Sequence, residues 1–286
     1  IPHVSIRNAY RTQYSRYHVA DFEESIVSKV MKNPMRAQQA LLRAASVPFM
    51  LKFNRILRRQ GVNERMTYDR YMHSDALVAM CDVPEFAPVD DAPASFRYMG
   101  PLIWRSREPA PDWIGELPKG RKALYISLGS TGTPELFDVL AAQLARRDRP
   151  LIITTGYQID RDAFPSRPGI YVEDMVNADE VFDRCAVVIC HGGNGTVYQA
   201  LSHGLVCIGI PTHLEQRYNC RRLVDMGLGG HLELDELKAD PAKLAGLVDR
   251  LLGDGDVRAR LCKFRSELAS WDAPSLTADC IEELVG

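Results

Sequence analysis

The chain has 286 residues and a formal net charge of −2 at pH 7, and 46% of its residues are hydrophobic. This length is typical of about two domains, and the apolar content predicts a folded globular protein rather than a disordered one. A charge so close to neutral provides no extended basic field, so we expect no nucleic-acid partner.

The cysteines indicate the compartment. The chain holds seven, an odd number, and Cys185, Cys190 and Cys207 lie in apolar runs without CxxC spacing. This pattern is typical of buried free thiols in a reducing compartment, not of a disulfide framework or a zinc site. No apolar run is long enough to span a membrane, and we expect a cytoplasmic protein.

Residues 1–100 are predicted to form a first, partial domain. The opening "IPHVSIRN" alternates like a strand that is already under way, which predicts that the chain begins inside a domain. A helical stretch is expected over about 21–59, broken at Pro34 and Pro48, and then a short strand over 76–80.

Proline marks the connection to the second domain. Seven prolines fall between Pro84 and Gly120. A segment so rich in proline is typical of a linker or an extended crossover, and we place the linker at residues 101–118.

Residues 119–286 are predicted to form one doubly wound α/β domain. Short apolar strands alternate with helical segments, as in a parallel sheet covered on both faces. The predicted strands are "ALYISLG", "PLIITTG", "AVVIC" and "VCIGIP", and the predicted helices are "PELFDVLAAQLARR", "GTVYQALSHG" and "EQRYNCRRLVDMG". Three further helices are expected over about 241–252, 257–270 and 276–284.

A glycine-rich turn, "HGGNG" from His191 to Gly195, follows the predicted strand "AVVIC". In an open parallel sheet, ligands bind beyond the carboxyl ends of the strands. The glycines let a ligand approach the backbone, and the next helix offers free N–H groups and a positive dipole end, which together suit a phosphate. His191 adds a donor. The alternative is a purely structural strand-to-helix turn, with a histidine at its edge whose hydrogen bonds are made within the protein.

Two common phosphate-binding loops are disfavoured. Neither "GSTGTPE" nor "GGNGTVY" ends in the Gly-Lys-Ser/Thr of a P-loop, and a GxGxxG motif from Gly193 fails because Tyr198 stands at its last glycine. An ordinary nucleotide triphosphatase or dinucleotide enzyme is therefore not expected.

Other loops at the same predicted sheet edge supply complementary chemistry. A small polar turn, Gly129-Ser130-Thr131, follows "YISL", and Glu215 and Gln216 after "VCIGIP" suit vicinal hydroxyls. Between strands, "IYVEDMVNADEVF" places two apolar residues, Met175 and Val176, in an otherwise polar loop. Together the loops predict a nucleotide-sugar pocket.

The run from "YVEDMVNADEVF" through "CHGGNGTVYQALSHG" to "EQRYNCRRLVDMGLG" resembles the donor-binding half of GT-B fold glycosyltransferases, in the UDP-glycosyltransferase and macrolide/sterol glycosyltransferase-like group. "RYMGPLIW", "PDWIGELP" and "ALYISLGSTG" fit the family's linker and first donor-domain strand in the same order. The resemblance covers about residues 98–235 and implies a GT-B fold, with a donor-binding domain after a partial Rossmann-like acceptor domain.

The resemblance also implies roles for individual residues. The residues implied to hold the donor diphosphate are Ser130, His191, Gly192, Gly193, Asn194, Gly195 and Thr196. Glu215, where an Asp is commoner, would bind sugar hydroxyls, and Gln216 the same sugar or the ribose. Met175 and Val176 fall in the loop that binds the base, although many members have an aromatic at or near Met175 and a Pro at Asn177.

Catalytic residues are not assigned. In the family the general base is a His near the amino terminus of the acceptor domain, and "IPHVSI" resembles a strand downstream of it, so we expect this chain to lack its own base. Nothing in the sequence gives His3, His18 or His73 the reach or the pKa of a substitute. No metal-ligand spacing joins His191 to another histidine, and no cofactor is expected beyond the nucleotide-diphosphate sugar as co-substrate.

The segment Pro48 to Gln60 alternates basic and apolar residues. A basic amphipathic helix can lie on an anionic membrane, and some relatives glycosylate lipids. The favoured interpretation is a domain helix with a solvated basic face, with peripheral membrane contact as the alternative.

The sequence therefore predicts a hexosyltransferase that moves a sugar from a nucleotide-diphosphate donor, UDP-linked by resemblance, to the hydroxyl of a small-molecule or lipid acceptor with inversion. One alternative is a donor-binding module without catalysis of its own, either a fragment or one chain of a split transferase. The other is a UDP-sugar epimerase, which shares the fold.

Overall fold

The computed structural model describes residues 4–9, 12, 14–17, 34–106, 109–118, 120, 122–129, 136–145, 149–164 and 168–286. These residues fall into two compact units, one of Ile1–Leu102 with Trp271–Gly286 and the other of Ile103–Ser270. Within the described ranges, no helix is both long and apolar enough to cross a membrane.

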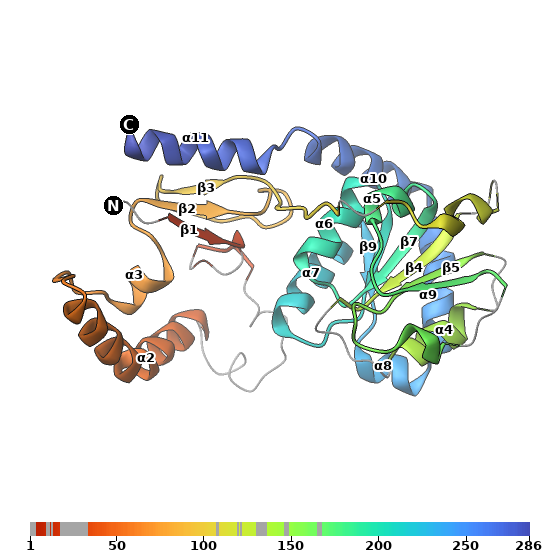
Figure 1. Ribbon diagram of the computed structural model, residues 1–286, viewed down its shortest axis with the longest axis horizontal. Coiled ribbons are helices and arrows are strands. Elements are labelled where there is room, and N and C mark those ends of the chain that lie inside the picture. Colours follow the sequence, from red (N-terminus) through yellow and green to blue (C-terminus); the bar gives the residue numbers. More distant parts are fainter. Residues whose placement is uncertain are drawn as a thin grey trace. The chain divides into compact units, whose positions relative to one another are not determined.

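The first unit is built on a small parallel sheet in the order β1-β2-β3. Its strands are β1 (Val4–Arg7), β2 (Leu77–Met80) and β3 (Phe96–Tyr98). The unit also contains the helices α2 (Pro34–Arg59), α3 (Tyr68–Met72) and α11 (Ala273–Val285). Side chains of β2 and α11 share one apolar core, and Figure 1 shows α11 running alongside this small sheet.

The C-terminal helix α11 lies in the first unit, whereas the sequence placed residues 119–286 in one domain. Ala273 is buried with Leu77 and Ala79 of β2, and Arg97 of β3 forms an ion pair of 2.7 Å with Glu283. An amphipathic helix shows the same pattern whichever sheet it covers, so the sequence alone does not reveal its partner.

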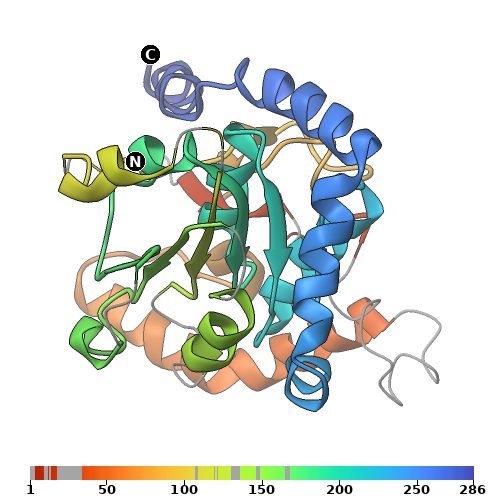
Figure 2. The ribbon, with the colours of Figure 1, turned by 90° about the vertical axis from the view of Figure 1, so that its right-hand side faces the viewer.

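The second unit contains a six-stranded parallel sheet in the order β6-β5-β4-β7-β8-β9. Its strands are β4 (Ala123–Ser127), β5 (Leu151–Thr154), β6 (Ile170–Glu173), β7 (Cys185–Cys190), β8 (Val206–Gly209) and β9 (Gly229–His231). The helices are α4 (Leu136–Leu144), α5 (Ala178–Phe182), α6 (Asn194–Ser202), α7 (Leu214–Asp225), α8 (Leu234–Ala239), α9 (Ala242–Gly253) and α10 (Gly255–Leu268). Helices flank both faces of this sheet (Figure 1), and Figure 2 shows α9 followed directly by α10 beside it.

The doubly wound topology is confirmed, and it fixes where a ligand binds. From β4 the chain adds β5 and β6 on one side and then returns to add β7, β8 and β9 on the other. The strand order therefore reverses between β4 and β7, which makes the carboxyl ends of these two strands the expected ligand site. The core strands β4, β5, β7 and β8 and the last three helices lie where the sequence predicted them.

Strands β6 and β9 and helix α2 differ from the prediction, and β3, α3, α5 and α8 are elements that the sequence did not predict. Strand β6 lies where the sequence predicted a loop, although Ile170, Tyr171 and Val172 have high strand propensity; its four residues are only half-buried. The residues of β9, two glycines and a histidine, have low strand propensity. Gly229 is required there because a Cβ would collide with the Cys207 carbonyl oxygen of β8. The expected break at Pro48 is wrong, since α2 continues through that residue.

The predicted linker 101–118 is for the most part a packed segment of the second unit. It contains a short 3-10 helix, η3 (Asp112–Glu116). Within it, Trp113 stacks on Tyr171 of β6 at 4.6 Å between ring centroids and donates a 2.8 Å hydrogen bond to Glu173. Proline punctuates this segment, but the aromatic contacts attach it to the sheet edge.

Candidate functional site

The glycine-rich turn lies at the carboxyl end of β7, beside the point where the strand order reverses. Gly192 has a φ of +85°, which glycine adopts without steric cost. Gly193 is the N-cap of α6, so Asn194, Gly195 and Thr196 form that helix's first turn. The first N–H groups of an α-helix have no partner within it, so this turn presents donors beyond the sheet edge.

The His191 side chain fits between two glycines. A Cβ at Gly129 would lie 2.5 Å from the imidazole Cε1, and a Cβ at Gly193 would collide with Nε2. Any larger residue at either position would expel the ring. The two loops that follow β4 and β7 thus share one buried imidazole, which is 9% exposed.

The electrostatic setting of His191 favours its neutral form. Burial lowers the pKa of His191, and the nearby His213 lowers it further, while the Glu215 carboxylate and the Ser127 backbone act in the opposite direction. Its Nδ1 and the Asn194 Oδ1 are buried without a hydrogen-bond partner among the described atoms. Unpaired buried polar atoms are uncommon and call for a ligand or water, so the turn has the character of a binding site.

The turn is braced from behind by α7. Asn219, which is fully buried, donates from Nδ2 to the Gly192 carbonyl at 2.9 Å. The Cys220 Sγ fills the space beside two glycines: a Cβ at Gly192 would approach it to 2.5 Å, and one at Gly209 would collide with it. These contacts fix the Gly192 backbone, and sequence inspection assigned no such role to Asn219 or Cys220.

Helix α7 also carries the two predicted hydroxyl-binding residues. Glu215 is half-buried in its first turn and close enough to His191 to influence its pKa. The Gln216 Oε1 accepts hydrogen bonds from Thr212 N at 2.7 Å, Thr212 Oγ1 at 3.0 Å and His213 N at 3.2 Å. Its amide oxygen thus caps the helix, a local role that the sequence prediction did not anticipate.

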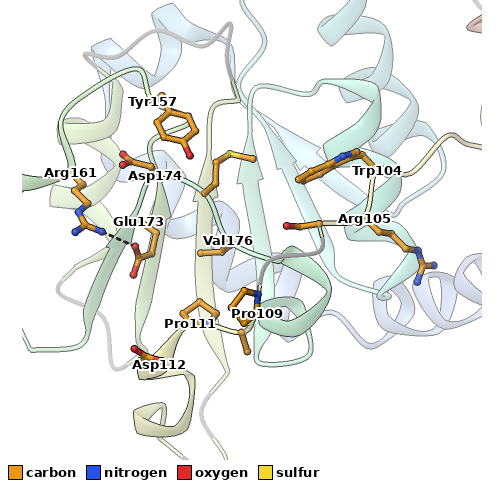
Figure 3. A pocket seen from close by; sticks show the side chains of 13 residues that line it. Trp104, Arg105, Pro109, Pro111, Asp112, Tyr157, Arg161, Glu173, Asp174 and Val176 are labelled. Carbon is orange, nitrogen blue, oxygen red and sulfur yellow. Dashed lines mark hydrogen bonds and ion pairs between the residues drawn. The ribbon is translucent and has the colours of Figure 1, made fainter.

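A cavity of about 890 Å³ lies at the carboxyl end of β6. Met175 and Val176 line it, with Met175 45% exposed and Val176 buried. Its remaining lining residues are Trp104, Arg105, Ser106, Pro109, Ala110, Pro111, Asp112, Tyr157, Arg161, Glu173 and Asp174 (Figure 3). The predicted base-binding pair therefore borders a real cavity, whose other walls come from the former linker and the loop after β5.

The cavity and the glycine turn lie along one edge of the sheet. Strands β6 and β7 are separated by β5 and β4, so their ends are about 14 Å apart at about 4.8 Å per strand spacing. The loops between them are linked, because Gln158 donates a side-chain hydrogen bond to the Gly129 carbonyl beside His191.

Four further residues named in the sequence analysis either lie outside the described residues or belong to the first unit. Ser130, His3 and His18 lie outside the described residues. His73 belongs to the first unit, and burial first and Arg7 second lower its pKa. In the part of the chain that the structure describes, no group of three or more His, Cys, Asp or Glu residues is arranged to hold a metal ion.

Comparison with known proteins gives one family match and consistent structural neighbours. The family model described as erythromycin biosynthesis protein CIII-like, C-terminal domain, matches residues 138–284. The PGL/p-HBAD biosynthesis rhamnosyltransferase of Mycobacterium bovis (strain BCG / Pasteur 1173P2) is 28% identical over 263 residues, which cover 90% of this chain and 57% of that protein. The chain thus spans little more than half the length of this curated relative.

Two solved structures share the architecture. The glycotransferase of kitacinnamycin has a TM-score of 0.72 at 22% identity, covering 89% of this chain and 68% of that one. The spinosyn rhamnosyltransferase SpnG complexed with thymidine diphosphate has a TM-score of 0.62 at 20% identity, covering 80% and 60%. These likenesses confirm the predicted fold class, the GT-B type of α/β architecture.

Proposed function

Because the chain belongs to the erythromycin biosynthesis protein CIII-like family through its C-terminal domain, we propose that it forms the donor-binding part of a glycosyltransferase. In this proposal it binds a nucleoside-diphosphate sugar, and the complete protein transfers that sugar to an acceptor hydroxyl with inversion. The relatives' names support sugar transfer as the reaction class.

The glycine turn at the reversal point of the sheet is the observation that carries this proposal. The buried His191 Nδ1, which has no hydrogen-bond partner among the described atoms, lies immediately before the start of α6. Backbone N–H groups and the positive helix end stabilise the charge that develops on a departing diphosphate. They do so without proton transfer, which suits a histidine held neutral by burial.

In this proposal, three sets of residues bind the three parts of the donor. His191 and the first turn of α6 hold the diphosphate, Glu215 binds sugar hydroxyls, and Val176 contributes to the base cavity. Glu215 lies in the first turn of the same helix, α7, whose Asn219 and Cys220 brace Gly192. The sugar and the diphosphate would therefore be positioned by one rigid element, as ordered transfer requires.

The nucleotide is proposed to be a pyrimidine diphosphate. The sequence resemblance favours UDP, and one structural neighbour, the spinosyn rhamnosyltransferase SpnG, is complexed with thymidine diphosphate (TDP). Uracil and thymine differ by one methyl group, and a cavity of about 890 Å³ has room for either. We therefore propose both as ligands and leave the preference to measurement.

A calorimetric titration tests the proposal. The chain is titrated with UDP, TDP and ADP, with circular dichroism as the folding control. We expect UDP or TDP to bind and His191→Ala to weaken that binding by about tenfold, the range for hydrogen bonds to charged groups. A folded chain that binds none of the three would contradict the proposal.

A donor-binding module without independent catalysis is the second candidate. It is favoured because the turn at His191 and the cavity described above can bind a donor without a general base. Incubation with UDP-linked or TDP-linked sugars and a simple acceptor, followed by product analysis, separates the two candidates. Binding without turnover supports the module.

Peripheral membrane contact and a reducing compartment extend the proposal. In α2, apolar Leu51 and Ile56 are 65% and 48% exposed, and basic Lys52, Arg55 and Arg58 are exposed beside them. This combination supports contact with anionic lipid, which co-sedimentation with vesicles would test.

All seven cysteines are free thiols, which supports placement in the cytoplasm.

A further inference from the structure

The cavity at the end of β6 is bordered by two exposed aromatic side chains that come from distant parts of the chain. Trp104, in the segment before η3, is 65% exposed, and Tyr157, in the loop after β5, is 76% exposed. Both line the cavity, and Figure 3 shows them on either side of it. Large aromatics left in solvent beside a cavity are typical of binding surfaces.

Tyr157 is held in place at a conformational cost. Its φ is +61°, in the left-handed region where a bulky side chain is an outlier. The loop enforces this conformation, because Thr155 Oγ1 accepts from Tyr157 N at 3.3 Å and donates to Asp174 at 2.8 Å. Strain of this kind persists where the surroundings over-determine it, and it concentrates at ligand sites.

Trp104 is connected to the elements that carry the rest of the site. Its backbone carbonyl accepts a hydrogen bond of 3.5 Å from Gln199 of α6, the helix that begins at the glycine turn. The next residue, Arg105, lies 3.9 Å from Asp179 of α5. The Trp104 segment is thus attached to the helix at the diphosphate end and to the helix that follows Val176.

The chemistry of the cavity fits a planar, uncharged heteroaromatic ring. Aromatic walls supply stacking, and apolar Met175 and buried Val176 line the cavity between polar groups. Charges of both signs lie around it, and one opposite pair, Arg161 and Glu173, forms an ion pair of 3.1 Å. A ring with a hydrogen-bonding edge would gain more here than a phosphate or a carboxylate.

We propose that Trp104 and Tyr157 are the stacking surfaces for the pyrimidine base of the donor. They supply the aromatic contact that Met175 does not. This inference rests on the proposed function, because it assigns the base end of a ligand whose diphosphate end lies at His191. It names two specificity-determining residues that are 53 positions apart in the sequence.

The test compares TDP with inorganic pyrophosphate, which lacks a base. Trp104→Ala is expected to weaken TDP binding by about tenfold, within the range for one base–aromatic stack, and to leave pyrophosphate binding unchanged. Trp104→Phe keeps an aromatic face and retains most of the TDP affinity. TDP, but not pyrophosphate, should quench tryptophan fluorescence, and Trp104→Phe should lose most of this quenching.

Tyr157 offers a matched pair of variants. Tyr157→Gly relieves the strain of the left-handed backbone and removes the ring, so the fold is preserved while TDP binding weakens by several-fold. Tyr157→Phe keeps the ring and the affinity. Tyr71→Ala, which removes a 42% exposed aromatic of the first unit, serves as the control with unchanged TDP binding.

The outcomes separate this inference from the proposed function. If the wild-type chain binds TDP and Trp104→Ala and Tyr157→Gly bind it equally well, the stacking assignment is overturned and the donor site stands. Equal weakening of TDP and pyrophosphate also overturns it, because the loss would then reflect a displaced diphosphate turn. A wild-type chain that binds neither ligand contradicts the proposed function itself, and the base site with it.

Discussion

The two ends of the proposed donor site are built in opposite ways. At the diphosphate end, His191 and Gly192 are buried and closely packed, and a methyl group at Gly129, Gly192 or Gly193 would collide with its neighbours. At the base end, the cavity is open and bordered by aromatics that are 65% and 76% exposed. The first end is specified by packing inside the protein, whereas the second leaves surface for a ligand to cover.

This difference explains what each end contributes. A diphosphate is common to all nucleotide donors, so its site gains from a rigid geometry set by the fold. The base distinguishes one donor from another, and its walls come from loops that can vary without disturbing the sheet. Substitutions at the two ends should therefore fail in different ways: by unfolding at the turn and by lost selectivity at the cavity.

Gly192→Ala should have the largest effect. The alanine would have to adopt a left-handed φ of +85°, and its Cβ would approach the Cys220 Sγ to 2.5 Å. Because both the backbone strain and the clash destabilise the folded state, we expect the unfolding free energy to fall by about 3 kcal/mol. Urea denaturation measures it. Gly246→Ala is the matched control, because a Cβ there, within α9, meets no atom within 4 Å. It should stabilise by about 0.5–1 kcal/mol, and similar effects of the two substitutions would contradict the packing account of the turn.

Asn219→Ala should have the next largest effect. It removes the 2.9 Å hydrogen bond to the Gly192 carbonyl inside the protein, which lowers the unfolding free energy by about 1–3 kcal/mol. TDP affinity should fall as well, because the backbone of the turn is released. Asn54→Ala is a control for stability, since Asn54 also makes buried hydrogen bonds, to Met50 and Met66, but in the first unit. If Asn219→Ala unfolds more easily yet binds TDP normally, the ability of the His191 turn to bind the ligand does not depend on the hydrogen bond from Asn219 to Gly192.

The titration of His191 gives a third prediction. Its pKa is lowered in the folded chain, so the unfolded state takes up the proton first as the pH falls. Above about pH 6.5, the pKa of histidine in the unfolded chain, His191 is neutral in both states and folding carries no protonation cost. As the pH falls below this value, the unfolded state is protonated first, and the unfolding free energy decreases. Diphosphate binding should change in the opposite direction, because a protonated imidazole attracts the anion.

Unfolding and TDP titrations at pH 7.5 and pH 5.5 would measure both trends. His191→Gln should reduce both pH dependences, whereas His73→Gln, at a residue of the first unit whose pKa is also lowered, should alter only stability. Identical pH profiles for wild type and His191→Gln would rule out the assigned titration.

Met175→Phe should have the smallest effect. Met175 is 45% exposed, so an aromatic there changes stability by less than about 0.5 kcal/mol. It adds an aromatic side chain to the lining of the cavity, and it should raise TDP affinity by about two- to fivefold. The gain should be larger in Trp104→Ala than in the wild type, because the two aromatics serve the same base. Equal gains in TDP affinity in both backgrounds would show that the side chains at positions 175 and 104 do not contact the same base.

The contrast between the two ends also explains what sequence reasoning could find. The turn lies within a few consecutive residues after the apolar strand β7, so its glycines and His191 can be identified from the sequence alone. The strands β4, β5, β7 and β8 are predictable for a similar reason, since each is a short apolar run. Asn219 and Cys220 are not predictable as braces, because nothing in α7 itself shows that they face Gly192.

The base end depends on contacts between distant segments. Trp104 lies in a proline-rich segment that the sequence assigns to a linker, and Tyr157 lies after a strand, in a loop without a motif. The placement of α11 in the first unit is a comparable case. Gly100, with a φ of +86°, leaves space for Trp271 there, and no local pattern relates these two residues. Such pairings appear only in three dimensions.

The comparison of TDP with thymidine monophosphate tests the central claim most directly, because the two ligands differ only in the phosphate that the turn of His191 is proposed to hold. Calorimetry on the wild-type chain and His191→Ala would measure both affinities. The account predicts that TDP binds at least about tenfold more tightly than the monophosphate in the wild type, and that His191→Ala removes most of this difference. Equal affinities for the two nucleotides in the wild-type chain would contradict a diphosphate site at this turn.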